Sequence, residues 1–253
     1  MKINRFLPLI TPILCFLLTE VYFFNHKMIY FSIIAIEVIL FFTVRQFTFT
    51  SRKDEKWWNY FILPALFTLN LIIFSALMPS KYFVQILLIF NLVFLYLYFR
   101  SIYYYLMEHS KYKENSMQNF SSYANFLSIY FIASAMYGLQ SFLNASVWLL
   151  MSILLVEVLL VVYQVMWSNK IDIRMGFFYI VLSGLVILEI AWTVSFLTLS
   201  YYILGLIIAI CYYLLIGLVR FYLLGTLTAT QIKHYMILGC ASILFVLLTA
   251  RWL

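Results

Sequence analysis

The sequence predicts an all-α fold, that of a polytopic helical membrane protein with about nine transmembrane helices. Of its 253 residues, 66% are apolar or aromatic and only 10% are charged, whereas a soluble domain carries about 25% charged residues. Nearly uncharged runs of about 20 residues recur along the chain, and each can cross roughly 30 Å of hydrocarbon. Lysine and arginine lie between these runs or near their ends.

The first apolar segment covers residues 6–24 and follows a short basic stretch, as the apolar part of a secretory signal does. It has no small-x-small cleavage pattern, so we expect it to remain as a first helix. Pro8 and Pro12 lie near its beginning, where a helix tolerates proline best.

Eight further apolar segments follow, separated by charged residues and turn signals. Lipid offers no partner to an unpaired backbone group, and the alternating pattern of a barrel strand is missing, so these runs are predicted to be helices. The predicted spans are residues 28–48, 57–78, 82–105, 122–143, 147–168, 175–198, 201–223 and 233–251.

The positive-inside rule predicts the orientation. With the N-terminus inside, 13 of the 16 lysine and arginine residues lie on the inner side, and adding or removing one helix would destroy this asymmetry. We therefore expect the N-terminus in the cytoplasm and the C-terminus outside. The inner residues are Lys2, Arg5, Arg45, Arg52, Lys53, Lys56, Arg100, Lys111, Lys113, Lys170, Arg174, Arg220 and Lys233, and the outer ones are Lys27, Lys81 and Arg251.

Motifs of soluble enzymes and of cofactor sites are absent. Cys15, Cys211 and Cys240 lie in apolar stretches without CxxC spacing, which predicts neither a disulfide framework nor a metal site. No Walker loop, GxGxxG, GxSxG or HExxH occurs. The basic residues are spread over short connections rather than gathered on one face, so we expect no cofactor and no nucleic acid partner.

An internal duplication is predicted because the chain aligns with itself at a shift of about 120 residues. A chain built from few apolar residue types also matches itself by chance, so rare polar positions carry the argument. The prediction is a parallel 4+4 tandem repeat, with four helices in 1–120, four in 121–230 and one additional helix in 231–253. The matched positions include Glu37 with Glu157, Glu20 with Gln140, Arg100 with Arg220 and, after a slip of one residue, Asn70 with Glu189.

Three glutamates are the main candidate site residues. Glu37, Glu157 and Glu189 each lie about nine residues, or 13 to 14 Å, below the outer end of their predicted helix. An ionised acid is costly at this depth, so we expect these side chains to face the bundle interior or a wet cavity. A low dielectric disfavours the ionised form of a carboxyl group, which suits such residues to proton exchange.

Amides and two further polar residues complete the candidate site. Asn70 and Asn91 fall at the same predicted depth as the three glutamates, and Glu20 and Gln140 lie nearer the outer surface, at about 6 Å. Three acids and two amides at one level are typical of a proton or cation site between the repeats of a transporter. Any of these residues can instead join two helices by hydrogen bonds alone.

One stretch of the chain resembles known proteins. Glu189–Trp192, then Ser195–Leu197, Tyr212–Tyr213 and Gly217–Leu218, resembles uncharacterised polytopic membrane proteins of bacteria with reduced genomes. The resemblance covers only the seventh and eighth predicted helices. It implies a location in the bacterial inner membrane, and it implies no activity, ligand or catalytic residue.

Three functions are compatible with these features. The leading hypothesis is a small transporter or exchanger that uses the buried glutamates as proton or cation acceptors. The second is a non-catalytic scaffold or assembly subunit, and the third is an intramembrane enzyme acting on a lipid-linked substrate. The third is disfavoured because no histidine pairs with the deep glutamates. The expected partners are the lipid bilayer, a small cation or proton, and a membrane protein or a second copy of the chain.

Overall fold

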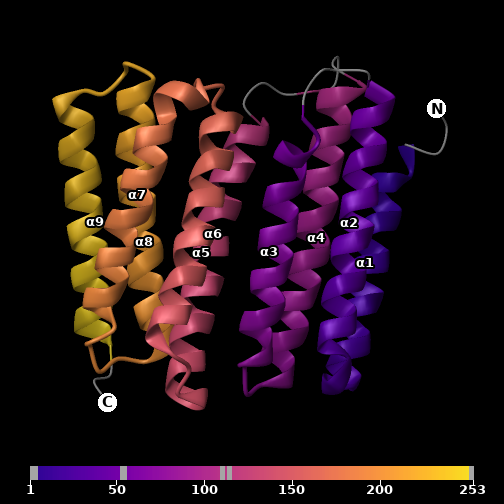
Figure 1. Ribbon diagram of the computed structural model, residues 1–253, viewed down its shortest axis with the longest axis horizontal. Helices are drawn as coiled ribbons and strands as arrows, with labels where there is room; N and C mark the ends of the chain where they lie inside the picture. The colour runs from indigo at the N-terminus through magenta and orange to yellow at the C-terminus, as the bar shows by residue number, and fades with distance from the viewer. Residues whose placement is uncertain (1–4, 52–55, 109–111, 113–115, 251–253) are drawn as a thin grey trace. The chain divides into compact units, whose positions relative to one another are not determined.

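A computed structural model describes residues 5–51, 56–108, 112 and 116–250. Within these residues, nine helices are long and apolar enough to cross a membrane, and no β-strand forms. The predicted all-α, polytopic class is confirmed, and the chain is a multi-pass membrane protein (Figure 1). The helices are α1 (Leu7–Phe24), α2 (Ile29–Ser51, preceded by the 3-10 helix η2, His26–Met28), α3 (Trp58–Ala76), α4 (Lys81–Leu106), α5 (Ser116–Leu143), α6 (Val147–Ser168), α7 (Ile173–Val194), α8 (Tyr201–Leu223) and α9 (Ala229–Thr249).

Two helices begin a full turn or more before their predicted apolar segments. Helix α5 starts at Ser116 rather than at 122, and the hydroxyl of Tyr112 accepts a hydrogen bond from a backbone N–H of its first turn. Helix α9 starts at Ala229 rather than at 233. There, the Thr228 hydroxyl accepts from the backbone N–H of Gln231, and the Gln231 side chain accepts from the N–H of Thr228. Such a capping box starts a helix in polar sequence, before the apolar run begins.

Helix α7 ends at Val194, earlier than the predicted 198. The Ser195 hydroxyl donates to the backbone carbonyl of Trp192 at 2.6 Å. Serine side chains compete with the helical hydrogen-bond ladder in this way, so the helix stops although the following residues are still apolar.

The chain divides into two compact units. Unit 1, Met1–Ser121, contains α1 to α4. Helix α1 lies along α2 and α4, and α3 packs against α2 and α4. The core of unit 1 forms between α3 and α4, where Phe67 stacks on Phe94 with 3.7 Å between ring centroids and the Tyr98 hydroxyl donates to the Tyr60 carbonyl at 2.9 Å. All four of these aromatic side chains are buried.

Unit 2, Ser122–Leu253, contains most of α5 and all of α6 to α9. Helix α6 packs against α7, α7 against α8, and α8 against α9. Helix α5 reaches three of them: Asn125 bonds to α6, Tyr137 donates to the Ala191 carbonyl of α7 at 2.7 Å, and the backbone at Ser134 lies against Gly205 of α8. The core of unit 2 therefore surrounds α5.

Helix α9 lies at the edge of unit 2. Gly239 is its one buried residue, and there the Leu214 side chain of α8 fits against the helix. The ninth helix thus packs on α8 within unit 2, and most of its side chains are exposed.

The internal duplication stays a prediction. The units meet between residues 121 and 122, next to the predicted boundary between 120 and 121. In each unit the first helix contacts the next three: α1 lies along α2 and α4 and is joined to α3 by the Tyr22–Ser75 hydrogen bond, and α5 contacts α6, α7 and α8.

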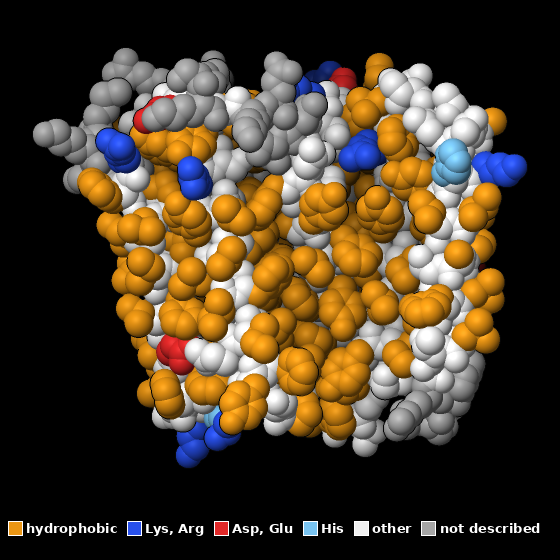
Figure 2. Space-filling model, turned by 180° about the vertical axis from the view of Figure 1, so that it is seen from behind, with side chains coloured by type: hydrophobic (Ala, Val, Ile, Leu, Met, Phe, Trp, Pro, Cys, Tyr) orange, Lys and Arg blue, Asp and Glu red, His pale blue; other side chains and the backbone are white. Residues whose placement is uncertain are grey.

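The surface has the character of a membrane protein. Figure 2 shows a broad band of hydrophobic side chains across one face, with lysine and arginine toward its upper and lower rims. Phe49 and Leu248 are each 83% exposed, as side chains that face lipid are. Of the residues used above to predict orientation, Lys2, Arg52, Lys53, Lys111, Lys113 and Arg251 lie outside the described residues.

Candidate functional site

The strongest candidate is a carboxyl group in the middle of α6. Glu157 is the eleventh of the 22 residues of this helix, about 15 Å from either end. It is only 6% exposed. The buried face of α6 recurs every three or four positions and includes Leu150, Leu154, Glu157, Val161 and Gln164. This acid therefore belongs to the helix face that packs inside unit 2.

Two hydrogen bonds join α6 to α5 along this face. The Ser128 hydroxyl donates to Oε1 of Glu157 at 3.3 Å, and Nδ2 of Asn125 donates to Oε1 of Gln164 at 2.7 Å. All four side chains are buried. Hydrogen bonds of this kind hold transmembrane helices in register, because hydrocarbon offers no other partner.

Two polar atoms near these bonds have no hydrogen-bond partner. They are Oδ1 of Asn125 and the hydroxyl of Tyr212 on α8, and both are buried. The Tyr212 hydroxyl lies close enough to Glu157 to interact with it electrostatically. Buried polar atoms without partners are rare in folded proteins, so each one is a candidate for a functional role.

These five residues form the Glu157 cluster: Asn125, Ser128, Glu157, Gln164 and Tyr212. Figure 1 shows the three helices that supply it, α5, α6 and α8. Neither α5 nor α6 contains a lysine or arginine. Chemically, the cluster can hold a proton on Glu157 and can offer hydroxyl and amide groups to a proton or a small polar ligand.

Glu189 does not join the cluster. It lies on α7, which buries Ser183, Gly184, Ile187, Ala191 and Val194. Because each helical residue turns the chain by about 100°, residue 189 points roughly 200° away from Ile187. Its side chain is accordingly exposed. The expectation that this acid faces the interior is not met within unit 2.

Glu37 lies in unit 1, on the flank of the buried face of α2. It is half-buried and lies near the Cys15 thiol of α1. Ile36 and Leu40 occupy the centre of that face and are fully buried. Unit 1 thus holds its own membrane-embedded acid.

The predicted amides are buried in unit 1. Asn70 of α3 is fully buried, and Asn91 of α4 accepts a hydrogen bond at Oδ1 from the Thr68 hydroxyl at 3.2 Å. The Thr68–Asn91 bond joins α3 to α4, as expected of side chains that fix helix pairing.

The two residues predicted nearer the surface have separate surroundings. Glu20 of α1 accepts a hydrogen bond from Nε2 of Gln85 of α4 at 2.6 Å. Gln140, near the end of α5, is half-buried in unit 2. Neither residue is among the hydrogen-bonding partners of Glu157 given above.

Sequence reasoning missed four members of the Glu157 cluster. Asn125 and Ser128 are three residues apart, and Glu157 and Gln164 are seven apart, so each pair shares one helix face. A search for polar residues at these spacings would have found both pairs. Tyr212 gives no such signal, because it is one of 21 tyrosines.

Among the described residues, no three His, Cys, Asp or Glu side chains gather into a group that could hold a metal ion. Comparisons with known proteins find no matching family model, no similar curated protein and no similar solved structure. The resemblance drawn from the seventh and eighth predicted helices gains no support from them. The candidate site therefore stands on its geometry.

Proposed function

We propose that the protein is a small proton-coupled transporter or exchanger in which Glu157 is the proton acceptor. The observation that carries the proposal is an acid at mid-depth in α6, buried among polar side chains, with the unpartnered Tyr212 hydroxyl beside it. Acids inside membrane segments are costly and typically belong to proton or ion pathways. With no lysine or arginine in α5 or α6, a proton is the simplest counter-charge.

Protonation of Glu157 supplies two states for such a mechanism. The carboxylate takes up a proton and becomes a neutral acid, which can remain between α5 and α6. Release of the proton leaves a charge that requires water or a cation. If the two forms favour different packings of α5 against α6, protonation shifts the side of the membrane from which the site is accessible.

A proton fits the cluster better than a coordinated metal cation. Glu157 and Gln164 are seven residues apart on α6, about 10.5 Å along the helix axis. Their hydrogen bonds to α5 therefore lie at two different levels along the contact between α5 and α6, not around one point. A Ca²⁺ or Mg²⁺ site instead needs about six oxygens around one point.

Within this proposal, Glu37 is the corresponding acid of unit 1, because the predicted repeat aligns it with Glu157. Asn70 and Asn91 are buried amide side chains of unit 1, as Asn125 and Gln164 are of unit 2. Glu189 serves as the comparison acid, because it has the same chemistry on an exposed helix face.

The test uses purified protein in proteoliposomes with a trapped pH indicator. A gradient of Na⁺ or K⁺ is imposed, and the initial rate of proton movement is recorded for the wild type, Glu157→Gln and Glu189→Gln. We expect the glutamine at 157 to abolish the movement and the glutamine at 189 to leave most of it. Equal rates in the wild type and Glu157→Gln would refute the proposed role.

Infrared difference spectroscopy on the same samples separates proton binding from the identity of the transported ion. Acidifying the wild type should produce the carbonyl band of a buried carboxylic acid, and Glu157→Gln should show a smaller band, because it retains Glu37 but has lost the Glu157 acid. A band of unchanged size in the variant would assign the titrating acid elsewhere and would overturn the proposal.

A second candidate function is a non-catalytic scaffold subunit, which the exposure of Glu189 favours. A carboxyl group on an exposed face of a membrane helix can be satisfied by a polar group of a neighbouring protein. Cysteine placed at position 189 should then cross-link to a defined partner or to a second copy in native membranes. The transporter proposal predicts that Glu157→Gln leaves any such cross-link intact.

A further inference from the structure

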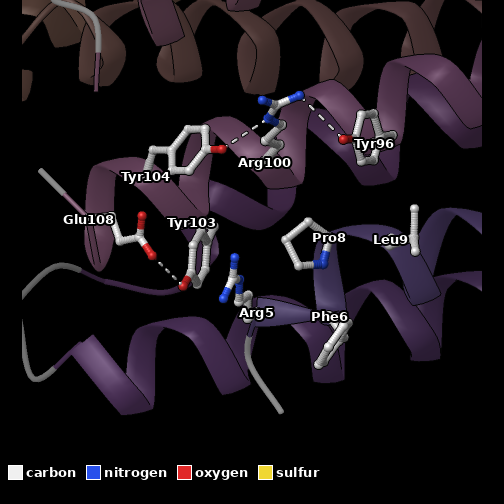
Figure 3. Close-up of a pocket in the computed structure, with 9 residues that line it drawn as sticks. All are labelled: Arg5, Phe6, Pro8, Leu9, Tyr96, Arg100, Tyr103, Tyr104 and Glu108. Atoms are coloured by element: carbon white, nitrogen blue, oxygen red, sulfur yellow. Dashed lines mark hydrogen bonds between the residues drawn. The ribbon is translucent and has the colours of Figure 1, made fainter. Parts of the chain in front are cut away.

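A pocket of about 310 Å³ lies at one end of unit 1, apart from the Glu157 cluster. It is formed by the chain at the start of α1 and by the last turns of α4 (Figure 3). Its polar lining consists of Arg5, Tyr96, Arg100, Tyr103, Tyr104 and Glu108. By the positive-inside rule, this is the predicted cytoplasmic end.

The guanidinium group of Arg100 is held in place by two tyrosines of its own helix. Its Nε donates to the Tyr104 hydroxyl at 3.2 Å and its Nη1 donates to the Tyr96 hydroxyl at 3.3 Å. The same group lies 5.5 Å from the centre of the Tyr104 ring and 5.9 Å from that of the Tyr96 ring. An arginine has five N–H donors, so three are left for a ligand.

Arg5 adds a second guanidinium group to the pocket, from the residues that lead into α1. The positive end of the α1 dipole adds to the potential at this point. The acid in the lining, Glu108, accepts a hydrogen bond from the Tyr103 hydroxyl at 3.1 Å. Two positive side chains against one negative favour an anion in the pocket.

The depth of the pocket corresponds to the level of lipid headgroups. Arg100 lies six residues, or about 9 Å, before the end of α4. Tyrosines of this kind are typical of the membrane interface. The apolar lining residues Phe6 and Leu9 are exposed and can lie against acyl chains.

We propose that this pocket binds a phosphate group, with Arg100 and Arg5 as its cationic ligands. Planar guanidinium groups bind phosphate through paired hydrogen bonds. A phospholipid headgroup and a free phosphate share this chemistry. The interfacial depth and the exposed apolar flanks favour an anionic phospholipid as the source.

The test is native mass spectrometry of the delipidated, purified full chain titrated with phosphatidylglycerol. Diacylglycerol, which has the same acyl chains and no phosphate, is titrated in parallel, and inorganic phosphate is added as a competitor. Wild-type protein should bind phosphatidylglycerol well above diacylglycerol. If inorganic phosphate displaces the lipid at low concentration, the phosphate site is upheld and its source is the free ion. If phosphatidylglycerol stays bound in the presence of inorganic phosphate, the source of the phosphate group is the lipid.

Variants locate the binding in the pocket. Arg100→Gln should weaken phosphatidylglycerol binding about tenfold or more, because it removes charge-assisted hydrogen bonds. Arg220→Gln is the matched control, since Arg220 lies near the end of α8 in unit 2, over the Phe221 ring at 5.1 Å. Equal weakening by both variants, or none by Arg100→Gln, would overturn the proposal.

A gentler change guards against loss of folding. The double variant Tyr96→Phe and Tyr104→Phe keeps the charge of Arg100 but removes the two hydroxyls that orient it. It should bind phosphatidylglycerol more weakly than the wild type and more tightly than Arg100→Gln. Binding unchanged from the wild type would show that the orientation of Arg100 does not matter and would contradict the proposed geometry.

Discussion

Glu157 and Glu189 are the same residue type in the same unit, and their positions on their helices give them opposite surroundings. Residue 157 falls in the buried series of α6, whereas residue 189 falls opposite the buried series of α7. Burial beside Ser128 and Tyr212 makes the first a candidate proton acceptor. Exposure makes the second a useful control.

Tyr212 supports a prediction about stability. Tyr212→Phe removes a buried hydroxyl that has no partner and keeps the ring. An unsatisfied buried polar group costs about 1 to 3 kcal/mol, so the variant should unfold at a higher temperature than the wild type. Thermal unfolding of the purified protein in one detergent measures the shift.

Tyr137 provides the matched control. Its hydroxyl donates to the Ala191 carbonyl at 2.7 Å, so Tyr137→Phe should destabilise the protein by about 1 kcal/mol. The two variants should therefore shift the unfolding temperature in opposite directions. An equal decrease in the unfolding temperature of both variants would contradict the prediction and would mean that the Tyr212 hydroxyl is hydrogen-bonded.

At the scale of elements, α5 organises unit 2 because it contacts three other helices by different means. It bonds to α6 through buried polar pairs, to the backbone of α7 through Tyr137, and to α8 by close backbone approach. Polar bonds and close approach both stabilise helix pairs in lipid, where apolar contact between helices gives little advantage over contact with lipid.

The Asn125–Gln164 pair should show energetic coupling. Asn125→Leu and Gln164→Leu are made singly and together, and the free energy of unfolding is measured for each. Each single variant removes the same 2.7 Å bond. The double variant should therefore lose less stability than the two single variants added together, with a coupling energy of about 0.5 to 2 kcal/mol. Strictly additive losses would contradict a direct bond between α5 and α6.

At Gly205, the backbone of α8 lies directly against the backbone of α5. A Cβ atom at this position would lie 2.6 Å from the Ser134 backbone nitrogen and 2.8 Å from its Cα. Since backbone cannot move aside as a side chain can, Gly205→Ala should destabilise the protein by about 1 to 3 kcal/mol.

Gly176→Ala is the control for this effect. A Cβ atom there would meet Met166 at 3.7 Å, an ordinary contact. Alanine is the better helix former by about 1 kcal/mol, so this variant should be neutral or slightly stabilising. Thermal unfolding of both variants measures the difference, and similar melting temperatures would contradict the close approach of α5 and α8.

For the whole molecule, the orientation in the membrane is open to direct measurement. The charge asymmetry predicts that His26 faces the outside and that Lys170 faces the cytoplasm. Single cysteines at these exposed positions, in a variant that lacks Cys15, Cys211 and Cys240, are treated in intact cells with a membrane-impermeant maleimide. Labelling at 26 and protection at 170 are expected, and the reverse pattern would invert the topology.

Most of the fold and part of the site could be predicted from the sequence. The spans 147–168 and 201–223 coincide with α6 and α8, because Ser146 and Asn169 bound the first run and Ser200 and Gly225 flank the second. Glu157 was predicted as a site residue, but its partners on α5 and α8 were not. A helix that is apolar all round carries no pattern to say which face meets another helix and which meets lipid.

The amino-acid sequence by itself determined that this chain is helical and crosses a membrane several times, because the unpaired backbone of any other structure is too costly in hydrocarbon. It also placed Glu37, Glu157 and Glu189 inside helices rather than in the connections between them. Only the tertiary structure decided that Glu157 turns inward to Ser128 while Glu189 turns outward. Core and lipid are equally apolar, so that choice depends on how the helices pack against one another.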